Sequence, residues 1–428
     1  MTLTQEDMTE KTIRILHTSD WHLGRMLYGR RREEGSQQFL NWLTQTIQQQ
    51  QIDVLLVAGD IFDNGAPANW AVSQYYRFLA GISTTDCRHV VITAGNHDSP
   101  SFLDASSELL DALDIHVVSY ADDLEKEVIT LKDKTGRPEL IVCAVPYLHD
   151  RDLRKTEAGE SQADKDWKTL QGIRAHYADV TAIAEKIRTA SGENIPIVAM
   201  GHLFTAGGRV EKEDGVRELY VGGLGKVGVD AFPSALGYVA LGHLHVPQVV
   251  NGQETIRYSG SPMPMGFNEA MQTKQVCLVT GKDDGIASVE TIAVPRFRKL
   301  ESIQGDWQSI IERINTLKAQ QEPVWIEVIY DGKETMPDLS EQLEQLVRET
   351  PIEILRVRNT HIINSALGSI YQGEMLEDLT EEDVFNRLLE QENKPEDERA
   401  ELRTLYQEIL QTVRQQPEDV KAAETEKA

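Results

Sequence analysis

The chain has 428 residues, which is enough for two or three domains with a sizeable core. Hydrophobic residues make up 40% and charged residues 26%, as in ordinary soluble proteins, and no apolar run is long enough to span a bilayer. The formal net charge of −26 argues against nonspecific adhesion to nucleic acid. Any phosphate chemistry in this chain must therefore be local.

The beginning of the chain and the cysteines point to the cytoplasm. Residues 1–12 are polar and contain no apolar stretch like the core of a secretory signal, so we expect a polar extension there. Three widely spaced cysteines form no Cys-x-x-Cys pair, which predicts buried or inert thiols in a reducing compartment: Cys87, Cys143 and Cys277.

Short apolar runs followed at once by polar, metal-capable residues occur five times along the chain. The runs are rich in Val and Ile without alternation, which is typical of strands buried on both faces. The clusters that follow them are Asp20-Trp21-His22, Gly59-Asp60-Ile61-Phe62-Asp63, Gly95-Asn96-His97-Asp98, Gly201-His202 and Gly242-His243-Leu244-His245.

Segments of helical period separate these runs, as in residues 39–47 and 70–79. Alternation of strands and helices predicts a layered α/β fold, in which ligands gather at the carboxyl ends of the strands. Apolar runs near residues 256–258, 276–279 and 289–294 predict further strands, so the first domain is expected to span 13–295.

The remainder of the chain predicts two smaller parts. Residues 296–365 contain two helical and two strand-like segments, which indicates a small α/β domain that we expect to cap the first. Residues 371–428 are acidic, and two apolar stripes at helical spacing predict a C-terminal helical hairpin.

Two carboxylates, one carboxamide and four imidazoles make up the candidate metal ligands. Mixed imidazole and oxygen donors favour manganese, iron or zinc, with magnesium less suited. A bridging carboxylate can hold two ions together for phosphoester cleavage, and Asp60 is the natural bridge. The candidate ligands are Asp20, His22, Asp60, Asn96, His202, His243 and His245.

His97 is the candidate proton donor, because an imidazole beside the ligand Asn96 can protonate a departing oxygen. Asp98 is expected to orient His97. A basic segment after the first cluster either contacts a phosphate backbone or is a solvated loop that balances nearby glutamates; its arginines are Arg25, Arg30, Arg31 and Arg32.

The ordered clusters, together with residues 17–24 and Tyr258-Ser259-Gly260-Ser261-Pro262, resemble the signature of the calcineurin-like metallophosphoesterases. More narrowly, they are similar to the nuclease subunits of bacterial DNA repair complexes within this superfamily. The resemblance covers nearly the whole chain. It departs from archaeal and eukaryotic relatives at Asp63, where those usually carry a histidine.

The resemblance implies a four-layer α/β/β/α sandwich and a double-strand exonuclease and single-strand or hairpin endonuclease with two manganese ions per subunit. It implies that one ion is held by Asp20, His22, Asp60 and His245, and the other by Asp60, Asn96, His202 and His243. It also implies a homodimer and a coiled-coil ATPase partner, bound through the C-terminal hairpin to give a heterotetramer that acts on DNA.

Three other functions remain open at this point. A protein phosphatase shares the metal set but usually has an arginine where this chain has Asn64. A cyclic-nucleotide phosphodiesterase would not need a cap and a helical tail. A noncatalytic scaffold is disfavoured because every candidate ligand position is filled.

Overall fold

The computed structural model describes residues 12–154, 160–205, 227–282, 285–334, 336 and 338–360, together with the isolated positions 399, 402, 403 and 406. The chain divides into two compact units. The first comprises Met1–Ser302, Glu322–Ile326 and Pro351–Leu355, and the second comprises Ile303–Gln321, Glu327–Thr350 and Arg356–Ala428.

The first unit contains two six-stranded mixed sheets. The first sheet is antiparallel at one edge only, and the second is antiparallel at both edges with parallel strands between them. The first sheet runs in the order β14 (Gly285–Ala293), β13 (Gln275–Lys282), β1 (Thr12–Thr18), β4 (Val54–Ala58), β5 (His89–Thr93) and β6 (Ile115–Val118). The second runs in the order β11 (Gln248–Val250), β12 (Gln253–Tyr258), β10 (Tyr238–Gly242), β9 (Ile197–His202), β8 (Pro138–Ala144) and β7 (Val128–Lys132).

Three apolar cores build four layers from these sheets. The inner core lies between the sheets, where strand residues such as Ile15, Leu56 and Met200 are fully buried. Its members alternate along β1 and β4 with residues of an outer core, because successive side chains of a strand point to opposite faces. The fold is therefore α/β, as predicted, and both of its large sheets are mixed.

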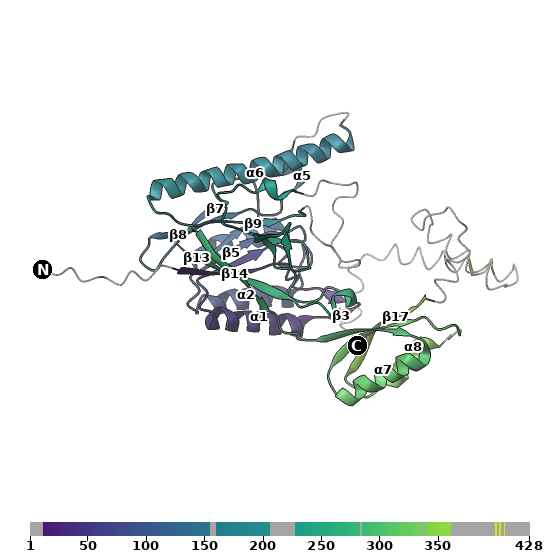
Figure 1. Cartoon of the computed structure of the whole chain (residues 1–428). Helices are drawn as coiled ribbons and strands as arrows, with labels where there is room; N and C mark the ends of the chain where they lie inside the picture. Colours follow the sequence, from purple (N-terminus) through teal and green to yellow (C-terminus); the bar gives the residue numbers. More distant parts are fainter. Residues whose placement is uncertain are drawn as a thin grey trace. The chain divides into compact units, whose positions relative to one another are not determined.

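Helices α1 (Glu33–Gln49) and α2 (Asn69–Ile82) cover the outer face of the first sheet, and α6 (Gln162–Ser191) covers that of the second (Figure 1). In α1, the apolar residues spaced three and four apart fall on one face, which is the face buried in the core. The helix α6 begins at a capping box formed by Ser161 and Asp164. It was not among the predicted helices, because its buried residues are interleaved with many charged ones.

Short elements complete the first unit: β2 (Met26–Leu27), β3 (Arg30–Arg31), α3 (Pro100–Asp104), α4 (Ser107–Asp111), α5 (Asp150–Leu153), η1 (Val229–Ala231) and η2 (Phe267–Glu269). A three-stranded sheet has the order β15 (Lys299–Gly305), β16 (Val324–Tyr330) and β17 (Ile352–Asn359), with α7 (Trp307–Gln320) and α8 (Leu339–Val347) between its strands in sequence. Strand β15 is the addition to the two strands and two helices that were predicted.

The predicted hairpin at 371–428 lies outside the described residues except for four isolated positions, and residues 1–11 of the predicted extension lie outside them too. Within the described part of the chain, no helix is both long and apolar enough to cross a membrane.

Candidate metal centre

The parallel arrangement brings the five predicted clusters to one edge of each sheet. Strands β1, β4 and β5 run parallel, and so do β9 and β10, so that the polar residues after each strand emerge at carboxyl ends. The two sheets also approach each other at these ends. His202 Nδ1 donates to the carbonyl of Ala58, the last residue of β4, over 3.0 Å. Residues 144 positions apart in the sequence therefore share one site.

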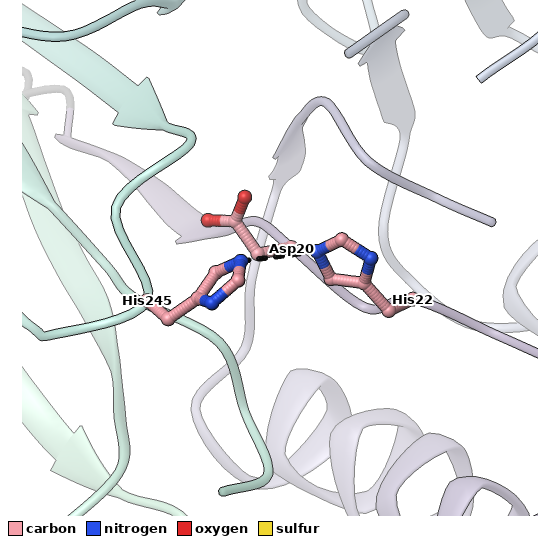
Figure 2. A group of neighbouring side chains, drawn as sticks. All are labelled: Asp20, His22 and His245. Carbon is pink, nitrogen blue, oxygen red and sulfur yellow. Dashed lines mark hydrogen bonds between the residues drawn. The ribbon is translucent and has the colours of Figure 1, made fainter. Parts of the chain in front are cut away.

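Asp20, His22 and His245 form one half of this site (Figure 2). All three are almost completely buried, and His22 Nε2 lies 3.1 Å from His245 Nε2. Ser19 Oγ donates to Asp20 Oδ2 over 2.6 Å, and the backbone N–H of His243 donates to Asp20 Oδ1 over 2.9 Å. The carboxylate is thus held in place from both sheets.

Asp60 lies between this half and the next. Its Oδ2 is 3.5 Å from His22 Nε2 and 3.3 Å from His202 Nε2. The carboxamide Oδ1 of Asn96 lies 3.0 Å from His202 Nε2 and 2.9 Å from His243 Nδ1. The structure therefore brings all of the sequence-predicted candidate ligands into one continuous cluster, with Asp60 between its two halves.

Backbone strain is concentrated in this cluster. Asp20, His22, Asp60 and His243 all have left-handed φ values, between 44° and 98°. A non-glycine residue in this region costs about 1–3 kcal/mol and persists where the surrounding structure enforces it. Here the enforcing contacts include the backbone hydrogen bonds from Asp20 to Gly59 and from His22 to Asp60, both 3.0 Å long.

Glycines allow the strands to converge this closely. A Cβ atom on Gly242 would collide with the carbonyl oxygen of Ala58, and one on Gly59 would collide with the His202 ring. Gly59 also has a φ of +80°, a conformation that glycine adopts without steric cost. The glycines that precede Asp60 and His243 in the sequence are thus needed for close packing of the two sheets.

The donor set fits a pair of divalent cations. Two buried imidazole nitrogens that face each other at 3.1 Å, as in His22 and His245, can share at most one proton, whereas a cation satisfies both. His202 Nε2 and His243 Nδ1 lie 3.0 and 2.9 Å from the same Asn96 oxygen, so the second part of the cluster also gathers two nitrogens and an oxygen around one point. Borderline cations suit such a mixed imidazole and oxygen set.

Electrostatics couple the groups of this cluster strongly. Burial lowers the pKa of His202, but the Asp60 charge and hydrogen bond outweigh it and raise that pKa to about 9. Burial and the neighbouring His202 charge lower the pKa of His243 to about 3. Burial opposes ionisation of Asp60, yet His202 holds the pKa of this carboxyl well below its usual range. Asp60 is therefore an anion at neutral pH.

His97 lies at the side of the cluster, with its ring centroid 5.0 Å from that of His22. Its Nδ1 donates to the carbonyl of Asp63 over 2.9 Å, and its backbone N–H donates to Asp60 Oδ1 over 2.9 Å. Asp98 was expected to orient the His97 ring, and this prediction is wrong. The carboxylate of Asp98 instead accepts the backbone N–H groups of Gly95, Ile61 and Phe62.

Asp63 supports the cluster from the loop after β4. Its Oδ1 lies 3.4 Å from His22 Nδ1 and 3.1 Å from Arg25 Nη1. The neighbouring His22 ring outweighs the effect of burial and lowers the pKa of the Asp63 carboxyl. Asp63 thus lies beside the outer nitrogen of His22, where a carboxylate can orient a histidine ligand of a metal site.

Some supporting residues escaped prediction. Ser19 bonds Ser259 as well as Asp20, and the buried Lys274 donates to the backbone carbonyl of His245 over 3.0 Å. A buried lysine has no signature in a linear sequence, because only its surroundings distinguish it from an exposed one. The segment around Ser259 was noted solely as part of the resemblance.

The arginines of the predicted basic segment differ in burial and in partners. Arg25 pairs with Asp63, and Arg30 Nε lies 3.2 Å from Glu353 Oε2. Arg31 is exposed, whereas Arg32 is buried. The four arginines therefore occupy different environments.

Two family models match the sequence of this chain. The family model described as calcineurin-like phosphoesterase matches residues 13–247, and the model described as type 5 capsule protein repressor C-terminal domain matches residues 296–393. A solved dimetal phosphatase from Danio rerio superposes weakly, with a TM-score of 0.36 and 12% identity over 66% of this chain and 99% of that one.

Curated relatives match over most of the chain. The D subunit of nuclease SbcCD from Escherichia coli K12 is 36% identical over 403 residues, which cover 94% of this chain and 98% of that protein. Its counterpart from Rhodobacter capsulatus is 38% identical over 60% of this chain and 64% of that protein. The chain therefore belongs to the calcineurin-like phosphoesterases and, within them, to the family of the SbcCD nuclease D subunits.

Proposed function

We propose that this chain hydrolyses DNA phosphodiesters at a two-manganese centre, as a double-strand exonuclease and a single-strand or hairpin endonuclease. The observation that carries the proposal is the burial of carboxylate, carboxamide and imidazole donors around Asp60, with His97 beside them. The relatives that match nearly the whole chain are named as nuclease subunits.

The candidate ligands divide into two sets that share Asp60. Asp20, His22 and His245 complete one set; Asn96, His202 and His243 complete the other. When bound, the two cations polarise the phosphate and supply a nucleophile at neutral pH. Mixed imidazole and oxygen donors suit manganese, iron or zinc better than magnesium, and the resemblance to nucleases with two manganese ions favours manganese among them.

His97 is the general acid that protonates the leaving oxygen. Because Nδ1 donates to the Asp63 carbonyl, the neutral ring carries its proton there, and Nε2 is the nitrogen that exchanges a proton. Burial lowers the pKa of His97, which makes the protonated ring a stronger acid. Nε2 then delivers its proton to the departing oxygen, as a general acid.

Asn64 favours a diester substrate over a phosphoprotein. Related phosphatases usually carry an arginine at that position to grip a terminal phosphate, and this chain lacks it. DNA has a single negative charge per phosphate, so that a metal pair suffices to neutralise the scissile group.

The assembly follows from the relatives' names, since a D component of an SbcCD nuclease implies a C component. We propose an SbcC-type coiled-coil ATPase as the partner, a homodimer of this chain within a heterotetramer, and binding of the ATPase by residues 371–428. Residues 296–365 serve as the cap that places DNA at the nuclease domain 13–295.

A substrate comparison tests the proposed activity. The purified chain is incubated with manganese and, separately, linear duplex DNA, hairpin DNA, a phosphopeptide and a cyclic nucleotide. We expect cleavage of the DNAs alone, with the Asp60→Asn variant and added EDTA as inactive controls. Hydrolysis of the phosphopeptide without cleavage of DNA would contradict the nuclease assignment.

A further inference from the structure

A basic cavity of about 110 Å³ lies in the first unit, outside the metal cluster. Its walls come from the start of α1, from the segment after β12 and from the segment that joins β14 to β15. One carboxylate lines the cavity, that of Glu34. Four arginines line it as well: Arg31, Arg32, Arg296 and Arg298. In a chain with a net charge of −26, this is a local concentration of positive charge.

Arg32 is the unusual member of this wall. Arg32 is only 8% exposed. Among the described residues, however, no carboxylate lies within ion-pair distance of its guanidinium. Arg25 and Arg30, on the same segment, both have such partners. Burial and the nearby Arg25 charge lower the pKa of Arg32 to about 10, so it stays charged at neutral pH.

A buried charge without a counter-ion is costly unless a ligand supplies one. The effective penalty is several kcal/mol per ion, and buried arginines are therefore normally paired. The carboxylate of the cavity, Glu34, lies 3.3 Å from Arg298, and the buried Glu269 is engaged at 2.5 Å by Lys274. The donors of Arg32 are thus left for an anion that enters the cavity.

The cavity is connected to the metal cluster through Lys274, which also lines its wall. The Nζ atom of Lys274 donates to the His245 carbonyl over 3.0 Å and to Ser261 Oγ over 3.1 Å. The loop that presents the candidate ligand His245 is therefore supported by a residue of the cavity wall. A ligand in the cavity lies beside the cluster without belonging to it.

The other lining residues select the kind of anion. Met263, Phe297 and Trp325 give the cavity an apolar side, and the Arg298 guanidinium lies 5.2 Å from the Trp325 ring centroid. Guanidinium and aromatic planes of this kind stack on nucleobases, while arginines bind phosphate through fork-like pairs of donors. A nucleotide combines both chemistries in one ligand.

We propose that the cavity binds a phosphate-bearing nucleotide, with the buried Arg32 as its phosphate ligand and Arg296 at the same wall. The proposal deepens the proposed function, on which it rests for the source of the nucleotide. That source is either a nucleotide of the DNA strand outside the scissile position or a released mononucleotide.

Binding without cleavage tests the site. A fluorescently labelled single-stranded oligonucleotide is titrated with the full-length chain in EDTA, and fluorescence anisotropy is followed over a series of salt concentrations. Arg32→Gln and Arg296→Gln are compared with wild type and with Arg137→Gln, an exposed arginine at the turn between β7 and β8. We expect about tenfold weaker binding for Arg32→Gln, because a charge-assisted hydrogen bond is lost.

The salt dependence separates a ligand from a structural residue. Loss of one phosphate contact lowers the slope of log K against log salt by about 0.7 for a single strand, whereas a folding defect leaves that slope unchanged. If Arg32→Gln does not fold, Arg296→Gln carries the same test. Wild-type affinity and slope in both variants, or no binding by wild type, would overturn the proposal.

Competition identifies the source of the nucleotide. Displacement of the oligonucleotide by thymidine monophosphate, lost in Arg32→Gln, supports a mononucleotide site; displacement by unlabelled oligonucleotide alone supports a strand site. Inorganic phosphate serves as the probe without a base. Because EDTA prevents cleavage, a chain that binds as expected but cleaves no DNA in manganese defeats the proposed function and leaves the cavity assigned.

Discussion

At the level of single residues, His97 and Asp60 have separable roles. The His97 ring is attached to the Asp63 carbonyl and approaches His22, whereas the Asp60 carboxylate reaches both His22 and His202. Removal of the His97 ring should therefore impair proton transfer, and removal of the Asp60 carboxylate should impair binding of the cations.

We expect His97→Ala to retain two manganese ions per chain and to lose about 10²- to 10⁴-fold in turnover, the usual contribution of a general acid. Asp60→Ala should lose the ions. Elemental analysis after gel filtration, combined with a DNA cleavage assay, checks both variants. His116→Ala, whose ring pairs with Asp111, is the matched histidine control. Loss of manganese from His97→Ala would contradict its assignment as proton donor.

The pKa of His202 predicts that metal binding depends on pH. Asp60 raises the pKa of His202 to about 9, so without cations the ring is protonated at pH 7. The ion pair with Asp60 stabilises the fold below the usual histidine pKa, and that contribution is lost as the pH rises through about 9. A cation needs the neutral ring, so it must displace this proton.

Manganese binding at pH 7 should therefore release about one proton from His202, and affinity should rise about tenfold per pH unit toward pH 9. Calorimetric titration in two buffers of different ionisation enthalpy measures the protons released. His22 adds to this release, because Asp63 and Asp60 overcome the effect of burial and raise its pKa. Binding at pH 7 without proton release would show that His202 is not a ligand.

At the level of elements, the site depends on how closely the ends of β4 and β10 approach. Gly242 ends β10, and a Cβ atom there would meet the carbonyl of Ala58 at the end of β4. The same carbonyl accepts the Nδ1 proton of His202. One added methyl group would therefore separate the two sheets where they share the cluster.

Gly242→Ala should destabilise the fold by about 1–3 kcal/mol, as overpacking of a core does, and should weaken manganese binding. Gly81→Ala is the control, because its Cβ would meet nothing within 4 Å and its position in α2 favours alanine. Urea unfolding with and without manganese measures both effects. Equal stability of the two variants would mean that the strand ends can move apart freely.

For the whole molecule, cations bound at the junction of two sheets should stabilise the fold. Since the site draws on both sheets, it does not exist in the unfolded chain, and binding to the native state alone shifts the unfolding equilibrium. Manganese at one hundred times its Kd should raise Tm by about 5 °C over EDTA.

Differential scanning calorimetry in manganese and in EDTA checks this expectation. Asp60→Asn should melt at the same temperature in both, because its bridging charge is gone. An equal rise in Tm for this variant would assign the stabilisation to cations bound elsewhere on the acidic surface.

Most of the strands, the candidate ligands and the family could be predicted from the linear sequence, because buried strands and metal donors have local signatures. The parallel order of the strands then follows from the alternation of strands and helices, and it predicts that the clusters meet. The helix α6 escaped prediction because its buried stripe, including Ile173 and Tyr177, is diluted by charged residues over thirty positions. Strand β15 escaped for lack of a distinct apolar run.

What remained was decided by three-dimensional packing. Asp98 differs from its predicted role because its carboxylate accepts the N–H groups of Ile61 and Phe62 from the distant loop after β4, and that of Gly95 from its own loop. The arginines of residues 25–32 look alike in sequence. In the folded chain, however, Arg25 and Arg30 each form an ion pair with a carboxylate, and Arg32 is buried in the wall of a cavity. The types of the donors are a property of the chain, whereas their partners, burial and charge depend on which segments folding brings together.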